Sequence, residues 1–416
     1  MSFTPDAVRV VIGGRDFRRW SSYTLKSSVF DVPSTFDMTI GKVDADTLDY
    51  LRRGAPVEIY IDVGEVEQLR LTGRIEGRDH EYDKSSHSLT ITGMDRARDL
   101  QVSSAPLGTE VAGRQFIDVV KDLIDPWGYK CILSNELDRA LACYKPNFKA
   151  LLKGSTSAEY YKYIEAQQRS GAGNTSFKAA CKAKGIPIPP YVHDGIVKKA
   201  ADAKVKPDET IWRFITRIAN KGEAIAWMSP SGHLVISRPQ YEQDPQYILS
   251  RRPNVPKENN VKRASERQKL GEVPTALAVY GKIRKKGKKR EPYTAQEFSE
   301  FVSYARDNYG LVRPVFLRAK DARDGDEIKK QARYALKGRE MAARTYTYTV
   351  AGHSQGGRVW TPDTTVQVVD EVFGVNEVMY IASVTMRRGR ALNSPAPQET
   401  DLELTPLDVW VPEGES

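Results

Sequence analysis

The sequence predicts a mainly β protein with an α+β middle, in which two similar tube-like β-barrel domains flank a small α+β domain with a helical insertion. Two observations carry this prediction. Apolar and polar residues alternate with a period of two in short stretches near both ends of the chain, which is typical of half-buried strands. In addition, residues 69–100 are similar in pattern to residues 378–410. Two β-domains that bracket a different middle are the simplest architecture.

The two similar stretches present their features in the same order. Each has an apolar-rich strand, a polar reversal and a short alternating strand, at residues 89–92 in the first copy and 402–405 in the second. Another strand precedes each copy, at residues 57–61 and 365–369. Alternation around a turn is typical of a β-hairpin. We interpret the similarity as a duplication, with a chance likeness of two hairpins as the alternative.

The first barrel is expected at residues 1–104. Its opening strand ends at Gly13 and Gly14, which tolerate the positive φ of a tight turn. The expected elements are strands at 8–12, 20–27, 34–40 and 57–61, and a short helical segment at 44–51. With the hairpin these make six or seven strands, and barrel closure would remove their exposed edges.

Helical spacing replaces alternation after about residue 104. Residues 105–137 and 204–240 are expected to form one α+β domain, with Asp208 as the N-cap of its second helix. Its expected elements are helices within 111–124 and 208–222 and strands at 129–133, 225–228 and 234–236. Residues 138–203 are rich in Lys, Ala, Tyr and Ser and are expected to be a helical insertion.

The remainder is expected to hold a linker and the second barrel. Residues 241–272 are polar and basic, which indicates a linker or an extended crossing strand. Residues 273–416 are assigned to the second tube-like β-barrel with a long helix. Its expected elements are a strand at 275–280, a loop that passes into a helix around 295–304, a long helix at 325–344, and strands at 344–350 and 364–369.

Composition is that of an ordinary folded protein, with 40% hydrophobic and 28% charged residues in a chain of 416. Apolar runs are too short to span a bilayer and the N-terminus does not resemble a signal peptide, so we expect folding in a cytoplasm. Cys131, Cys143 and Cys181 lack CxxC spacing and are interpreted as buried thiols. Part of the net charge of +9 lies in the basic run 282–290, interpreted as a solvated loop, with phosphate or acidic-partner contact as the alternative.

No catalytic, cofactor-binding or metal-binding residue is assigned. The five histidines, His80, His87, His193, His233 and His353, lack the spacing of a metal site. Ser354 lies in a Gly-His-Ser-Gln-Gly stretch similar to a hydrolase motif, but the sequence that follows predicts a strand where a nucleophile elbow needs a helix. The carboxylates Glu76, Asp79, Glu81 and Asp83 lie at a hairpin reversal, where solvent-facing acids are ordinary.

Several motifs, in order, resemble the baseplate hub proteins of contractile phage tails, most closely the Mu type. They are Gly13, Gly14, Phe17 and Trp20 near the start, the segment 206–227, the strand 344–352, the Val-Trp-Thr-Pro-Asp turn at 359–363 and the terminal stretch 404–410. The resemblance covers about residues 8–137 and 205–410. The insertion 138–203 and the basic run 282–290 depart from it.

The resemblance implies a structural virion protein without cofactors. It implies a homotrimer in which each subunit gives two tube-like barrels, so that six similar domains adapt a threefold central spike to the sixfold tail tube around a channel. The implied partners are the spike, a tail tube or tube-initiator protein, other baseplate proteins, and tape-measure protein or DNA in the channel. The alternatives are the hub part of a phage-derived injection or secretion device and, in another class, a tail-associated cell-wall hydrolase. Because the chain ends at Ser416, we expect no fused spike.

Overall fold

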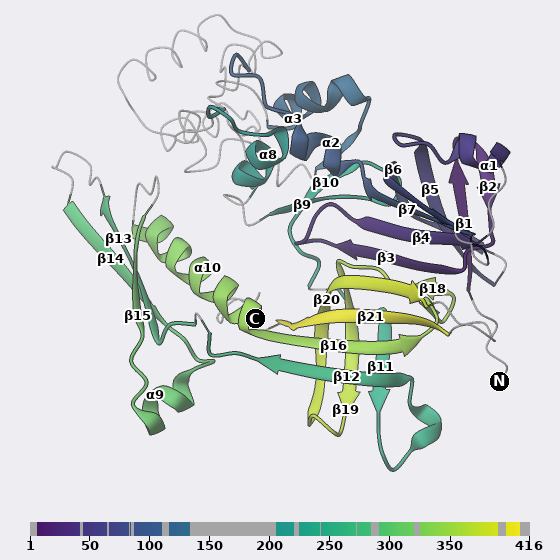
Figure 1. Ribbon diagram of the computed structural model, residues 1–416. Coiled ribbons are helices and arrows are strands. Elements are labelled where there is room, and N and C mark those ends of the chain that lie inside the picture. Colours follow the sequence, from purple (N-terminus) through teal and green to yellow (C-terminus); the bar gives the residue numbers. More distant parts are fainter. Residues whose placement is uncertain are drawn as a thin grey trace, which may run out of the picture.

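A computed structural model describes residues 6–41, 45–64, 66–82, 84, 87–109, 116–133, 205–219, 224–241, 243–271, 273–283, 291–319, 325–389 and 397–407. Within them the protein is mainly β, and one 13-stranded sheet dominates it (Figure 1). The expected insertion 138–203 lies outside the described residues. No helix in the described part is long and apolar enough to cross a membrane.

The N-terminal half of the large sheet confirms the strands expected there. It consists of β1 (Ala7–Ile12), β2 (Arg15–Phe17), β3 (Ser22–Ser28), β4 (Thr35–Gly41), β5 (Pro56–Val63), β6 (Val66–Tyr82) and β7 (His87–Asp95), with helices α1 (Ala45–Tyr50) and α2 (Ala97–Val102). Gly13 and Gly14 make the first turn at φ values of 55° and 84°, a region that costs glycine little.

The C-terminal half of the sheet begins earlier than expected. Residues 241–272, expected to be a linker or a crossing strand, contain two strands of this sheet. The half consists of β11 (Tyr247–Arg251), the 3-10 turn η5 (Pro256–Glu258), β12 (Val261–Gln268), β16 (Arg344–Ala351), β19 (Thr364–Asp370), β20 (Val375–Arg388) and β21 (Gln398–Pro406), with the small hairpin β17 (Ser354–Gln355) and β18 (Arg358–Val359).

The two halves repeat one pattern of strand pairing. The order β3-β4-β7-β6-β5 in the first half matches β12-β16-β21-β20-β19 in the second, with every neighbour antiparallel. The bulge after Ile75 in β6 matches the bulge after Ile381 in β20. Strands β4 and β16 also match in sequence, as Thr-Phe-Asp-Met-Thr-Ile-Gly and Thr-Tyr-Thr-Tyr-Thr-Val-Ala. The similarity seen in the sequence therefore extends to the topology.

In place of two separate closed barrels, the large sheet follows one open path from β12 to β2, and β19 and β11 branch from it at β20. The path is continuous because β20 runs past the end of β19 and pairs there with β3. A single hydrophobic core spans both halves, and Phe36 and Met38 belong to the same buried cluster as Tyr346, Tyr348 and Trp360. Figure 1 shows the first half, in purple, beside the green and yellow strands of the second.

The α+β unit joins two chain segments around one core. Its elements are α3 (Phe116–Ile124), the 3-10 turn η1 (Asp125–Trp127), β8 (Cys131–Leu133), α8 (Ile211–Ala219), β9 (Ile225–Met228) and β10 (Leu234–Ser237). Asp208, expected to be the N-cap of α8, is not its cap. Its φ is 57°, and Thr210 Oγ1 accepts the hydrogen bond from the Arg213 N–H at 3.2 Å, so the cap lies directly before the helix.

Residues between β12 and β16 form a separate small sheet covered by a helix, so the assignment of all of 273–416 to one β-domain is corrected. Its elements are β13 (Ala276–Ile283), β14 (Glu291–Phe298), α9 (Ser303–Tyr309), β15 (Pro314–Arg318) and α10 (Gly325–Ala343). The helix expected around 295–304 is wrong, because residues 295–298 pair with β13. Ile328, Ala332 and Leu336 of α10 pack on Leu277 and Val279, as their spacing predicts.

Candidate assembly interface

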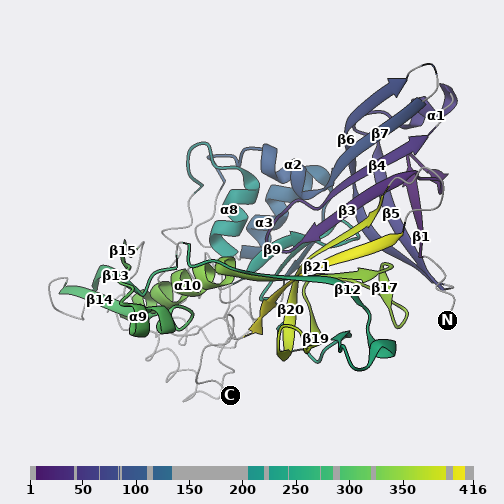
Figure 2. The ribbon, with the colours of Figure 1, turned by 60° about the horizontal axis from the view of Figure 1, so that its bottom comes forward.

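The two halves of the chain meet edge to edge where β20 pairs with β3. The pairing is antiparallel and runs from Ser383 opposite Ser28 to Arg388 opposite Tyr23. Figure 2 shows the strands of the first half continuing into those of the second at this point. The backbone hydrogen bonds of the joint convert two similar β-units into one sheet.

A buried polar network reinforces the joint. The Tyr23 hydroxyl lies 2.8 Å from His353 Nε2, and His353 Nδ1 lies 2.9 Å from Thr400 Oγ1. Gln398 Nε2 donates to the Tyr23 hydroxyl at 2.8 Å, and Thr400 Oγ1 donates to the Gly352 carbonyl at 2.6 Å. Because Gln398 donates at one end and Thr400 donates at the other, His353 must accept at Nε2 and donate at Nδ1.

The network therefore contains a neutral imidazole. His353 is fully buried, and burial lowers its pKa to about 4 because a charged ring would lose its hydration. Its backbone N–H also donates to Asp6 Oδ2 at 2.6 Å. Nothing in the sequence identifies this histidine as buried, since Gly352 and Ser354 on either side of it are typical of an exposed turn.

The face of the sheet opposite the core is polar and rich in threonine. In the first half Asp37, Thr39, Thr90 and Thr92 lie on it, and the Thr39 and Thr90 hydroxyls are 3.0 Å apart. Burial raises the pKa of Asp37, and the nearby carboxylate of Asp79 raises it further. The face contains hydroxyls and both signs of charge, which suit contact with water.

The same face continues in the second half. Arg387 pairs there with Glu399 at 3.1 Å and with Asp401 at 3.0 Å, and Lys262 pairs with Glu399 at 3.1 Å. Burial disfavours the ionised form of Glu399, but these two cations outweigh burial and lower its pKa. Thr349 donates to Asp401 at 2.6 Å.

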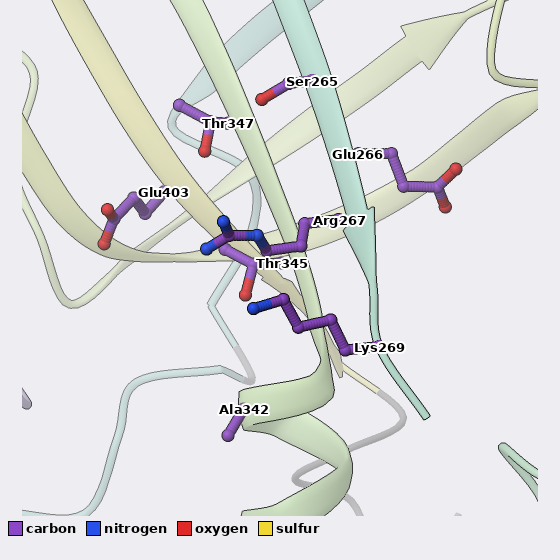
Figure 3. A pocket seen from close by; sticks show the side chains of 8 residues that line it. All are labelled: Ser265, Glu266, Arg267, Lys269, Ala342, Thr345, Thr347 and Glu403. Atoms are coloured by element: carbon purple, nitrogen blue, oxygen red, sulfur yellow. The ribbon is translucent and has the colours of Figure 1, made fainter. Parts of the chain in front are cut away.

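A hollow lies at the outer edge of this face. In Figure 3, Arg267 and Lys269 extend toward Thr345, whereas the Glu266 side chain points away from them. The lining residues are Ser265, Glu266, Arg267, Lys269, Ala342, Thr345, Thr347 and Glu403. The hollow extends over β12, β16 and β21 and is lined mostly by polar and charged side chains.

Open strand edges among the described residues include one in each half of the large sheet, on β6 and on β12. β6 pairs with β5 only as far as Arg74, so residues 77–82 have β7 on one side and no strand on the other. β12 pairs with β16 on one side only. Both segments are exposed, and Tyr82 at the end of β6 is 82% exposed. Unpaired N–H and C=O groups of this kind pair readily with another strand.

The residues considered for catalysis do not come together. The Ser354 hydroxyl donates to Asp6 at 3.0 Å. The ring of the adjacent residue, His353, forms hydrogen bonds with Tyr23 and Thr400 instead. Ser354 pairs with Val359 in a hairpin, so the stretch is not followed by a helix.

The four carboxylates of the hairpin do not form a described cleft. Asp79 and Glu81 are exposed on β6, Glu76 lies at its bulge, and Asp83 is outside the described residues. Across the described ranges, no cluster of three His, Cys, Asp or Glu residues could hold a metal ion. Residues 284–290 of the basic run, together with Cys143, Cys181 and His193, also lie outside the description.

Comparison with known proteins identifies relatives of this architecture. A tail protein from Neisseria meningitidis MC58 superposes with a TM-score of 0.69 at 21% identity, over 98% of each chain. The 43 kDa tail protein of prophage MuSo2 from Shewanella oneidensis superposes with a TM-score of 0.66 at 16% identity, over 97% of this chain and 99% of that one. These similarities show a shared fold.

A chain of the half-lidded Francisella PdpA-VgrG complex also shares the fold, with a TM-score of 0.52 at 8% identity over all of this chain and 60% of that one. No curated protein matches the chain in sequence. The family model of Mu phage baseplate assembly protein GpP-like, N-terminal, matches residues 7–95, which include β1 to β7. The resemblance to Mu-type baseplate proteins is thus confirmed, and in sequence it rests on the similarity of residues 7–95 to this family model.

Proposed function

We propose that this protein is the structural hub of a contractile phage tail baseplate, a homotrimer that adapts a threefold central spike to a sixfold tail tube. The observation that carries the proposal is the duplicated β-unit, whose copies join edge to edge through β20 and β3. One chain then offers two similar surfaces, and three chains offer six. The fold shared with two phage tail proteins supports this role.

The symmetry argument is physical. A ring closes only when head-to-tail interfaces repeat at a rotation that brings the last subunit to the first. A duplicated unit lets a trimer meet a sixfold partner with six near-equivalent surfaces and a threefold partner with three equivalent ones. We place the tail tube or its initiator on the first kind of surface and the spike on the second, with other baseplate proteins around them.

We assign the lining of the central channel to the polar face of the sheet. Its threonines and its mixed charges, such as Arg387 between Glu399 and Asp401, are hydrated without presenting one sign of charge to a passing polymer. A surface of one positive sign would retain DNA by counterion release. The channel we propose therefore allows tape-measure protein or DNA to pass without holding it. The protein would be located in the virion tail and assembled in the host cytoplasm.

A second candidate function is the hub part of a phage-derived injection or secretion device. The fold shared with a chain of the Francisella PdpA-VgrG complex favours it. Both candidates assign the same trimeric ring to this chain and differ in the particle that contains it. Neither needs an enzymatic step from this chain.

The test is the native mass of the purified full chain, alone and with its spike protein, followed by cryo-microscopy of the assembled species. A species of three times 46.7 kDa, with a hollow ring of six similar β-units, is expected. A chain that stays monomeric when mixed with the spike contradicts the hub. Cell-wall degradation by the purified chain in a zymogram would favour the hydrolase in its place.

A further inference from the structure

We propose that the open edge of β6 in one copy of the chain pairs with the open edge of β12 in the next copy, in an antiparallel register that places Asp79 opposite Arg267 and His80 opposite Glu266. The proposal rests on the trimeric hub proposed above and names the joint through which its subunits meet. The partner is a second copy of this chain.

The template for the joint lies inside the chain. Beyond its bulge, β20 pairs with β3 over residues 383–388. In that register Thr385 lies opposite Lys26, and Met386 lies opposite Leu25. Within one chain, the edge of β20 in the second half is therefore already paired with β3 of the first half.

β6 presents the edge that corresponds to that of β20. Each strand shifts register by one residue near the point where its first neighbour ends, after Ile75 in β6 and after Ile381 in β20. Each then continues along one remaining neighbour, β7 or β21. With the two bulges aligned, Asp79 corresponds to Thr385, and His80 corresponds to Met386.

β12 is the counterpart of β3. The matching strands β4 and β16 align Phe36 with Tyr346, by sequence and by their pairing with β7 and β21. Phe36 lies opposite Leu25 in β3, and Tyr346 lies opposite Glu266 in β12. Glu266 therefore takes the place of Leu25. One residue further along, Arg267 takes the place of Lys26.

The register of the internal joint, transferred to the second pair of edges, brings the opposite charges of Asp79 and Arg267 together on the polar face. It places His80 opposite Glu266 on the other face. Opposite charges stabilise a cross-strand pair, and like charges destabilise it. A slip of one residue in one direction would place Asp79 against Glu266, and any slip of one residue would exchange the two faces. The charges therefore select one register.

The edges are free to make this contact. Asp79, His80, Glu266 and Arg267 are all exposed, and no strand among the described residues lies beside either edge. Because the two edges belong to different halves of the chain, the contact is head to tail and generates a ring or a filament. Internal and external joints then alternate, so that three chains make six β-units.

The test is a cysteine pair in the full chain, assembled with its spike protein. The Asp79→Cys/Arg267→Cys variant should form covalent dimers and trimers under mild oxidation, because both side chains point to the same face of adjacent strands. The matched control, His80→Cys/Arg267→Cys, places the thiols on opposite faces and should not cross-link. The single variants Asp79→Cys and Arg267→Cys control for cross-links that involve the three natural cysteines.

Charge reversal gives a second readout that needs no oxidation. Asp79→Arg and Arg267→Asp should each raise the concentration needed for half-assembly by about tenfold or more, and the two combined should restore it. A trimer by native mass that neither cross-links nor responds to either reversal overturns this joint and leaves the hub standing. A chain that is monomeric in every sample overturns the hub and the joint together.

Discussion

Tyr23 and His353 lie 330 residues apart in the chain, yet the Tyr23 hydroxyl and His353 Nε2 are 2.8 Å apart at the joint between the two β-units. Tyr23 belongs to β3, and His353 follows β16. The contact is buried. Its donor and acceptor are fixed, because it lies at the centre of a chain of hydrogen bonds that runs from Gln398 to Gly352. It fixes how one unit meets the next.

We expect Tyr23→Phe to reduce the free energy of unfolding by about 1–3 kcal/mol, because His353 Nε2 and the Gln398 amide would lose a buried partner. Denaturant unfolding followed by tryptophan fluorescence measures the change. Tyr309→Phe is the matched control, since Tyr309 is 75% exposed and should change stability by less than about 0.5 kcal/mol. Equal effects in the two variants would contradict the network.

The buried imidazole predicts a pH dependence of stability. The folded pKa of His353 is about 4, below its ordinary value of 6.5. Between these values the unfolded chain binds a proton that the folded chain does not, so stability from this group rises with pH through that window and is complete above it. The shift corresponds to about 3 kcal/mol. We expect the stability difference between wild type and His353→Gln to be larger at pH 7.5 than at pH 4 by roughly that amount.

Stability must be compared between wild type and the variant at each pH, because carboxyl groups with a raised pKa act in the opposite direction. Burial raises the pKa of Asp95 to about 6 and the pKa of Asp363 to about 6. As pH falls, each carboxyl group takes up a proton at a higher pH in the folded chain than in the unfolded chain. The contribution of each group to the free energy of unfolding therefore decreases as pH rises through that range. Their effects cancel between wild type and His353→Gln. A difference that does not change with pH would show that His353 is not buried as a neutral ring.

The sequence indicated the strands that have one buried face and one polar face. The alternation of 344–350 predicts β16, and the spacing of Ile328, Ala332 and Leu336 predicts the buried face of α10. For residues 241–272, which contain β12, the sequence indicates only a linker or an extended crossing strand. The residues of β12 after Val261 are mostly exposed, so β12 lacks the alternation that a half-buried strand shows.

Long-range pairing was beyond local patterns. Nothing in residues 22–28 or 383–388 indicates that they lie side by side, because register is decided by the whole fold. The small sheet between β12 and β16 was missed for a related reason. Glu291–Phe298 lacks a run of apolar residues, and it becomes a strand through pairing with β13.

Gly93 tests the packing inside the first unit. A Cβ at Gly93 would clash with the Arg74 carbonyl oxygen and with the Phe36 ring, which lies over it. We expect Gly93→Ala to reduce the free energy of unfolding by about 2 kcal/mol, because neither neighbour can move without disturbing the sheet. Thermal unfolding measures the change. Gly108→Ala is the control, because its Cβ meets no atom within 4 Å. Similar transitions for the two variants would contradict this packing.

Two glycines make opposite predictions for the small sheet and its helix. Gly338 lies exposed in α10, and a Cβ there meets nothing within 4 Å, so Gly338→Ala should raise the free energy of unfolding by about 0.5–1 kcal/mol through helix propensity. Gly281 lies in β13, and a Cβ there would come within 2.8 Å of Ile328 Cδ1 and 3.0 Å of Ala319 Cβ.

Gly281→Ala should therefore reduce stability by about 1–3 kcal/mol, because α10 would have to move away from the strand that it covers. Denaturant unfolding of both variants beside wild type measures the two signs. Stabilisation by Gly338→Ala together with a neutral Gly281→Ala would mean that α10 is helical but does not pack on β13. Stabilisation by Gly338→Ala together with destabilisation by Gly281→Ala would show that α10 packs on the sheet. Ile328 makes this contact through the cluster that it shares with Leu277 and Val279.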